Sequence, residues 1–317
     1  CINIRRKDYT EKSRNNTNSS NDSSPEDNIE NKFSDKNLTN TEAQTNQKTL
    51  NTEEINFDFE DNLNEKVPEE IISKLKKIVD TVPKLELTIK ESLYLKEGLV
   101  IKINALGLID KSLRNIKDGN TYFGILSPND EKNDKKIDFS TGNSSNLVES
   151  GRQFCIRFDL DENCYMIKDC SCGNGYGSFM KLVKEMKIKD NTLINIGNNY
   201  IVFTLGVDEL EPNEDEDDID EEIEKVLSVK VFRGELINYS YVFNESQINK
   251  IYIGNNESCN IALNDNLVDD IHCSIEYSKE RGWILNDGYN NKKSEIGTWV
   301  SLSDETKIFE GMIIQSN

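Results

Sequence analysis

The sequence predicts an all-β protein with two β-sandwiches in tandem, preceded by a disordered tail and one amphipathic helix. Short apolar runs with a period of two recur between turn residues from residue 84 to 207 and again from 226 to 317, a pattern typical of antiparallel sandwiches. An almost purely acidic stretch separates these two regions. A chain of 317 residues has room for two such domains and for further sequence without a core.

Residues 1–66 are predicted to be a disordered, acidic and asparagine-rich tail. Polar residues dominate it, and Phe33, Phe57 and Phe59 are isolated. So little apolar surface cannot offset the entropy that the chain loses on ordering. Ser24 before Pro25 suits a kinase site, but polar linkers commonly contain such residues.

Residues 67–83 are predicted to form one amphipathic helix. Pro68 suits the first turn of a helix, and Ile71, Leu75 and Ile78 recur at spacings of four and three residues. Pro83 ends the pattern. We expect the apolar stripe to dock on a neighbouring core rather than on a partner helix.

Residues 84–207 form the first predicted sandwich. Leu85, Leu87 and Ile89 alternate with polar residues, which indicates a half-buried strand. Further strands are expected at residues 99–103, 121–126, 137–139, 154–160, 165–168, 179–182 and 200–205.

Residues 208–225 are predicted to be a solvated linker, because a nearly continuous run of acidic residues repels itself. The run lacks the central glycine and the ligand spacing of a calcium loop. Residues 226–317 form the second predicted sandwich, which we expect to be C-terminally truncated because one further strand would be needed after residue 317. Its strands are expected at residues 229–232, 241–243, 250–254, 261–263, 273–275, 283–285 and 298–300.

Charge and cysteine usage restrict the class of protein. The chain has 58 acidic and 38 basic side chains, a net charge of -20, which opposes non-specific binding to nucleic acid. It has no long apolar run, no signal-peptide pattern and no spacing typical of a disulfide framework. We therefore expect an intracellular protein, cytoplasmic or nuclear, with reduced thiols. If Met-Gly preceded Cys1, the basic residues 5–7 would complete an acylated membrane anchor.

No residue pattern indicates an enzyme, a cofactor or a metal site. Four cysteines cluster in the first predicted sandwich: Cys155, Cys164, Cys170 and Cys172. They lack a C-x-x-C pair and a nearby histidine, so zinc is not expected. His272 and Cys273 are adjacent on a predicted strand and face opposite sides, which excludes a catalytic dyad. Residues 290–294 look like a loop insertion, to which we assign no chemistry.

A series of motifs follows in order along the second region. They are Ile253-Gly254, Ile261-Ala262-Leu263, Ile271-His272-Cys273-Ser274-Ile275, Trp283-Ile284-Leu285-Asn286-Asp287 and Gly297-Thr298-Trp299-Val300. Their order and spacing resemble a forkhead-associated (FHA) domain. The first region is more faintly similar to the same family through residues 122–125, 136–140, 150–156, 166–169 and 177–180.

The resemblance implies a β-sandwich that binds phosphothreonine peptides at loops on one end. Members of the family use an arginine after an early glycine, a serine three residues before a histidine, and an asparagine before Gly-Thr. The first two positions hold Asn255 and Asp269 here, and Ile296 precedes Gly297-Thr298. Only His272 matches, so the resemblance implies a vestigial site in the second sandwich, made of Asn255, Asp269, His272 and Thr298.

The first sandwich provides another set of candidate phosphopeptide-binding residues. They are Ser150, Arg152, Asn174 and Ser178. An arginine fork with hydroxyl and amide donors suits a dianionic phosphate, and Lys181 or Lys184 would add charge if it lay nearby. Gln153 and Ile125 depart from the family's histidine and arginine.

These observations predict a non-enzymatic adaptor that binds protein partners and reads phosphothreonine through its first sandwich. One alternative is a structural assembly subunit whose FHA-like modules bind independently of phosphate. Another is the regulatory part of a longer signalling enzyme.

Overall fold

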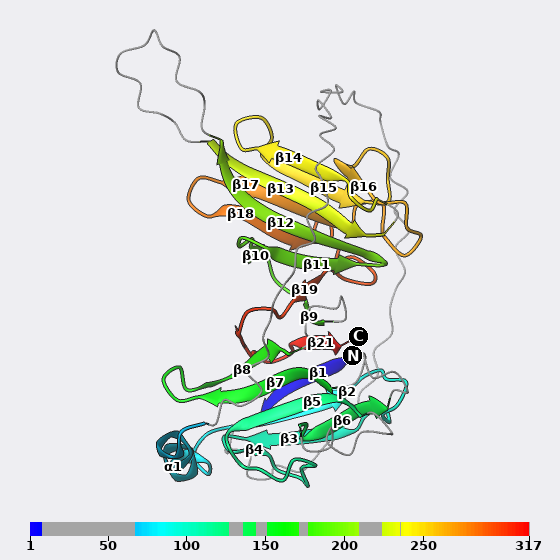
Figure 1. The fold of residues 1–317 in the computed structure, drawn as a ribbon. Helices are drawn as coiled ribbons and strands as arrows, with labels where there is room; N and C mark the ends of the chain where they lie inside the picture. Colours follow the sequence, from blue (N-terminus) through cyan, green and yellow to red (C-terminus); the bar gives the residue numbers. More distant parts are fainter. Residues whose placement is uncertain are drawn as a thin grey trace, which may run out of the picture. The chain divides into compact units, whose positions relative to one another are not determined.

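The computed structural model describes residues 1–7, 67–126, 136–143, 151–170, 177–208, 224–234 and 236–316 (Figure 1). The described residues belong to one compact unit. The predicted disorder of residues 8–66 and the predicted linker at residues 209–223 lie outside the described residues.

The predicted amphipathic helix is confirmed as α1, Glu69–Ile78. Pro68 precedes it, acidic residues occupy its first turn and Lys76 and Lys77 its last turn, so its charges complement the helix dipole. Leu75 is 2% exposed and joins the hydrophobic core of the neighbouring strands. The helix therefore docks on the chain's own core.

All other secondary-structure elements of the described structure are β-strands, which confirms the predicted all-β class. Before the acidic run the strands are β1 (Ile2–Lys7), β2 (Lys84–Ile89), β3 (Val100–Asn104), β4 (Gly107–Leu108), β5 (Asn120–Leu126), β6 (Phe139–Asn143), β7 (Gly151–Asp159), β8 (Cys164–Asp169), β9 (Ser178–Lys181), β10 (Met186–Lys187), β11 (Thr192–Ile196) and β12 (Asn199–Asp208). After it they are β13 (Glu224–Arg233), β14 (Ser240–Asn244), β15 (Lys250–Gly254), β16 (Ile261–Ala262), β17 (Cys273–Ser278), β18 (Gly282–Asp287), β19 (Trp299–Ser301), β20 (Thr306–Lys307) and β21 (Ile313–Ser316).

These strands build two sandwiches that share one continuous eleven-stranded sheet. In the first sandwich the order β9-β21-β1-β2-β3-β4 faces the five-stranded sheet β20-β8-β7-β5-β6. In the second sandwich the order β19-β11-β12-β13-β14 faces the sheet β10-β18-β17-β15-β16. The strand orders of the two sandwiches correspond except for β4, which has no counterpart in the second sandwich. Each sandwich also contains one parallel pair, β5 with β6 and β15 with β16.

The correspondence reveals a reciprocal exchange of strands between the two halves of the chain. The strands that follow β9 leave the first sandwich: β10 pairs with β18, β11 with β19, and β12 with β13. The strands that follow β19 make the opposite move: β20 pairs with β8, and β21 with β9. The chain crosses at residues 182–185 and 302–305, beside the antiparallel pair of β9 and β19.

The exchange corrects the predicted domain limits of 84–207 and 226–317. Residues 186–208 pack in the second sandwich, and residues 302–316 pack in the first. On the side of β13 that faces away from β14, the second sandwich is completed by β12. A sequence pattern cannot show this, because corresponding strands of two similar sandwiches carry the same alternation and fit either partner.

The strand β1 corrects the predicted extent of the tail. The composition places residues 2–7 in the disordered tail, but they pair with β2 along their whole length and also with β21. Ile2 is 7% exposed and Ile4 is fully buried. Two isoleucines among polar residues are a weak sequence signal, and pairing on both sides supplies the order that composition does not predict.

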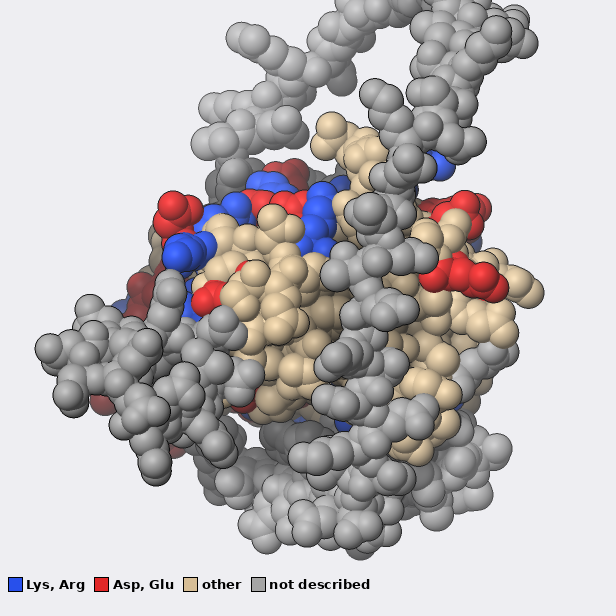
Figure 2. Space-filling model, turned by 90° about the horizontal axis from the view of Figure 1, so that it is seen from above, with Lys and Arg blue, Asp and Glu red and all other residues tan. Residues whose placement is uncertain are grey.

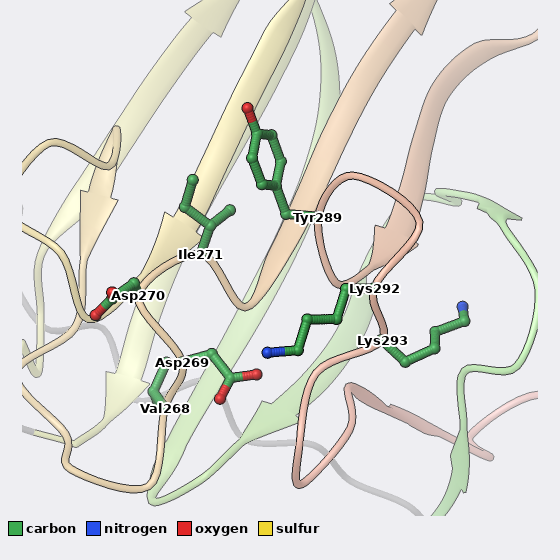
Figure 3. A pocket seen from close by; sticks show the side chains of 7 residues that line it. All are labelled: Val268, Asp269, Asp270, Ile271, Tyr289, Lys292 and Lys293. Carbon is green, nitrogen blue, oxygen red and sulfur yellow. The ribbon is translucent and has the colours of Figure 1, made fainter. Parts of the chain in front are cut away.

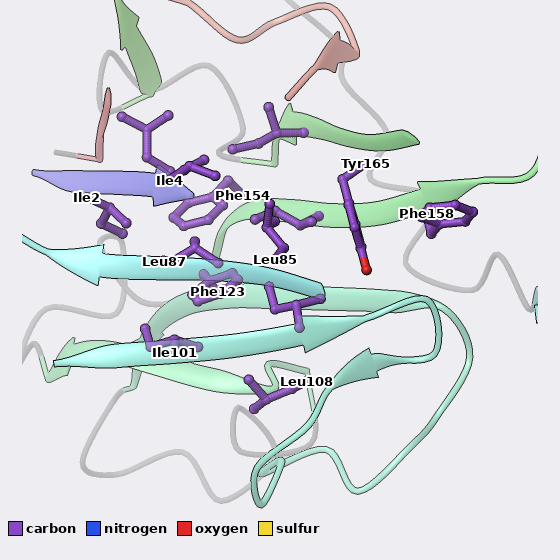
Figure 4. Close-up of a cluster of buried hydrophobic side chains, with 14 of the residues drawn as sticks. Ile2, Ile4, Leu85, Leu87, Ile101, Leu108, Phe123, Phe154, Phe158 and Tyr165 are labelled. Carbon is purple, nitrogen blue, oxygen red and sulfur yellow. The ribbon is translucent and has the colours of Figure 1, made fainter. Parts of the chain in front are cut away.

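Three clusters of buried side chains form the core. The first fills the first sandwich and includes residues from β1, β2, β5, β7 and β21 (Figure 4). The second fills the second sandwich and takes Ile194, Ile201 and Phe203 from the exchanged strands β11 and β12. A small third cluster of Phe179, Tyr200 and Trp299 lies at the crossing.

Candidate protein-interaction site

A hollow of about 430 Å³ opens at one end of the second sandwich. It lies between the connection from β16 to β17 and the connection from β18 to β19. Figure 3 shows the side chains that line it: Val268, Asp269, Asp270, Ile271, Tyr289, Lys292 and Lys293.

The backbone around Asp269 and Asp270 is held by close contact with the end of β15. A Cβ added to Gly254 would lie 2.1 Å from the Asp270 carbonyl oxygen, so only glycine permits this approach. The backbone N–H groups of Asn255 and Asn256 donate to the carbonyls of Asp269 and Asp270 at 2.9 and 3.1 Å. The Asn255 side chain accepts from the Asp265 N–H at 3.1 Å. Asn255 therefore fixes these loops through its backbone N–H and its side-chain oxygen.

Asp269 connects the two loops that enclose the hollow. Its Oδ2 accepts a hydrogen bond from the Glu295 N–H at 2.9 Å. Figure 3 shows Lys292 extending across the hollow toward this carboxylate. The position where the family's serine is expected is thus an acid that helps to shape the site.

A buried carboxylate, that of Asp287, holds the loop between β18 and β19 from the inside. Asp287 Oδ1 accepts hydrogen bonds from the Ser294 hydroxyl and from the Thr298 N–H and hydroxyl, both at 2.9 Å. Lys293 Nζ lies 4.0 Å from Asp287 Oδ2. Thr298 is fully buried, so it supports the loop from inside and cannot reach a bound peptide.

His272 lies beneath the same loops and supports them from the interior of the sandwich. It is fully buried, and its Nδ1 accepts from the Asp269 N–H at 3.4 Å. Its Nε2 has no hydrogen-bond partner among the described residues. Burial lowers the pKa of the imidazole, although the Gly297 backbone and the carboxylates of Asp287 and Asp269 oppose this shift. A neutral imidazole in this position stabilises the loops and does not contact the hollow.

Sequence reasoning missed the cationic part of the site. The sequence assigns no chemistry to residues 290–294, yet Lys292 and Lys293 line the hollow together with Tyr289. The available signal was a pair of adjacent lysines just after the Asp287 strand. The hollow contains two lysines and two aspartates, so its formal charges balance.

The structure describes two of the first sandwich's four candidate residues, Arg152 and Ser178. Ser150 and Asn174 lie outside the described residues. Arg152 is half-buried, its Nε donates to the Lys136 carbonyl at 2.8 Å, and its guanidinium stacks 3.6 Å from the centre of the Tyr122 ring.

The prediction that Ser178 binds a peptide does not agree with its position in the structure. It is fully buried, its N–H donates to Asp169 Oδ1 at 2.8 Å, and its hydroxyl lies 3.2 Å from that of Ser316 on β21. Its hydroxyl therefore serves strand packing. Lys181, the proposed extra cation, lies 5.8 Å from the ring of Trp299 at the crossing.

No group of three or more His, Cys, Asp or Glu side chains in the described ranges could hold a metal ion. None of the described cysteines forms a disulfide, and burial raises the pKa of Cys155 and Cys273. No helix in this part of the chain has the length and hydropathy of a membrane span.

The visible charge pattern is mixed. In Figure 2, basic and acidic residues lie side by side around a broad area without charged groups. Among the described residues of this face, Figure 2 shows no large patch of one charge.

Comparison with known proteins bears on the region that contains the hollow. No curated protein matches the chain. Residues 251–315 match the model of the FHA domain, and this stretch includes every residue that lines the hollow. The match indicates a module for protein interaction, of the kind that generally recognises phosphopeptides.

Proposed function

We propose that the chain is a non-enzymatic adaptor with two FHA-like modules, and that the hollow of the second sandwich binds a partner segment without requiring phosphate. The observation that carries the proposal is the hollow itself. It lies between loops of the matched region and is lined by two basic and two acidic side chains.

Two features support a second FHA-like copy in the first sandwich. Gly124 takes the same position in β5 as Gly254 in β15, and an added Cβ would lie 2.0 Å from the Gly151 carbonyl oxygen. Asp169 accepts from the Ser178 N–H as Asp287 accepts from the Thr298 N–H. Both features constrain the backbone and its packing. Because they occur at corresponding places in the two sandwiches, they support the view that both sandwiches have the same FHA-like fold.

The chemistry of the hollow supports recognition without phosphate. A dianionic phosphate is bound best by several charge-assisted donors, particularly an arginine fork. Here the negative charges of Asp269 and Asp270 balance the positive charges of the two lysines. The side-chain oxygen of Asn255 accepts a hydrogen bond from the loop backbone at Asp265. A segment with its own mixed charges, or with a hydroxyl for Tyr289, complements this surface better than a phosphate group does.

The test uses the full chain and a library of phosphothreonine peptides with their unphosphorylated twins. We expect peptides that bind equally with and without phosphate, and Lys292→Glu to weaken this binding about tenfold by reversing one charge beside the bound segment. Lys96→Glu, on an exposed lysine elsewhere, is the matched control. Phosphate-dependent binding that Lys292→Glu abolishes, or no binding to any peptide, would contradict the proposal.

Phosphothreonine reading by the first sandwich is a second candidate function. Arg152 supports it, because the Lys136 carbonyl and the Tyr122 ring orient its guanidinium in advance. The same library would then show phosphate-dependent binding that Arg152→Ala removes and Lys292→Glu leaves intact. Loss of this binding in both variants would contradict a separate site in the first sandwich.

A further inference from the structure

The strand β1 occupies a slot in the middle of a sheet. Its residues pair with β2 from Ile2 opposite Ile89 to Lys7 opposite Lys84. On its other side it pairs with β21, and Ile4 exchanges backbone hydrogen bonds of 2.9 Å with Met312 and Gly311. Removal of β1 would leave two unpaired strand edges facing each other, which is a template for another strand.

The slot selects for apolar residues at alternate positions. Ile2 and Ile4 point into the first core cluster, where Figure 4 shows them above the side chains of β2. Their neighbours Leu87, Met312 and Ile314 are at most 1% exposed, so an empty slot would expose side chains that are otherwise buried. Backbone pairing supplies general affinity, and the two isoleucine positions supply register.

The connection between β1 and the rest of the sandwich is long. In the second sandwich the corresponding strand, β12, follows β11 after only Gly197 and Asn198. In contrast, residues 8–66 stand between β1 and the next described residue, Val67. A stretch of this length can span up to roughly 200 Å when extended, so it permits β1 to reach a slot on another molecule.

We propose that the slot between β2 and β21 is a strand-acceptor site and that residues 2–7 of a second copy of this chain can occupy it. Every copy carries both the strand and the slot, so mutual exchange between two copies satisfies both slots and closes as a dimer. The same contacts form whether β1 fills the slot of its own chain or that of a second copy. Which of the two arrangements dominates depends on the concentration of the protein.

The first experiment tests the slot in the folded protein. A protease site is inserted within residues 8–66 of the full chain and cleaved after folding, so that no variant has to fold without β1. We expect the fragment with residues 2–7 to stay bound and to be displaced by a labelled peptide of residues 1–8. A peptide with Ile2→Asp and Ile4→Asp should bind at least about 100-fold more weakly. Immediate loss of the fragment, or failure of the labelled peptide to bind, would overturn the acceptor site.

The second experiment tests the occupant. Two full-length versions of different mass are unfolded together, refolded at increasing concentration and examined by native mass spectrometry. We expect mixed dimers whose fraction rises with concentration, and none when both versions carry Ile2→Asp and Ile4→Asp. Peptide binding without mixed dimers at any concentration would overturn the second copy as occupant.

Discussion

The loops around the hollow depend on one buried acid at the end of β18. Asp287 Oδ1 accepts three hydrogen bonds from Ser294 and Thr298. Replacing Asp287 by alanine leaves these buried donors without an acceptor, which should lower the free energy of unfolding by about 3 kcal/mol. Urea denaturation measures this change, and Asp304→Ala, on a side chain that is 72% exposed, should change it by less than about 0.5 kcal/mol. Equal effects of the two variants would show that the hydrogen bonds around Asp287 do not support the fold.

His272 predicts how stability depends on pH. It is the chain's single histidine, and burial lowers its pKa below the ordinary value of 6.5. Below about pH 6.5 the unfolded chain takes up a proton that the folded chain does not, so this contribution to stability is lost as pH falls. We expect the free energy of unfolding to fall more between pH 7.5 and 5.5 in the native protein than in His272→Gln. Identical pH dependence of the two proteins would mean that His272 titrates normally in the fold.

The contact between β15 and the next loop sets the shape of the hollow. In Gly254→Ala the new Cβ would meet the Asp270 carbonyl oxygen, so the loop that lines the hollow has to move. We expect a loss of about 3 kcal/mol in the free energy of unfolding and weaker peptide binding. Gly206→Ala in β12, where no atom lies within 4 Å of the added Cβ, is the matched control. Two variants of equal stability would refute this close approach.

The elements differ in how far the sequence predicts them. The helix at Glu69–Ile78 and strands such as β2 follow from strong local periodicity. The two isoleucines of β1 are too few to predict a strand, because the order of β1 comes from partners far along the chain. The role of Lys292 and Lys293 was also hidden, because a loop's position relative to Asp269 is set by tertiary contacts.

At the scale of the whole molecule, the exchange makes the two halves of the chain interdependent. The first half contributes Leu182, Ile188, Ile194, Ile201 and Phe203 to the second core cluster, and the second half contributes Leu302, Met312 and Ile314 to the first. Burial of each such side chain stabilises the folded state by about 1.5–3 kcal/mol. Separating the halves would expose all of them, which resembles unfolding more than the opening of a contact between domains. The candidate binding regions of both sandwiches are therefore parts of one cooperative unit.

This interdependence predicts the result of cutting the chain between β12 and β13. A protease site within residues 209–223 is cleaved in the folded protein, and the two fragments should elute together from a size-exclusion column until denaturant is added. A disulfide between Lys187→Cys and Ile284→Cys, which face each other across β10 and β18, should form readily because directly opposed residues of paired strands are close enough for it. It would join the two cleaved fragments on a non-reducing gel. Separate elution, together with failure to form this disulfide, would mean that each half keeps its own strands, since only the exchanged arrangement places β10 beside β18.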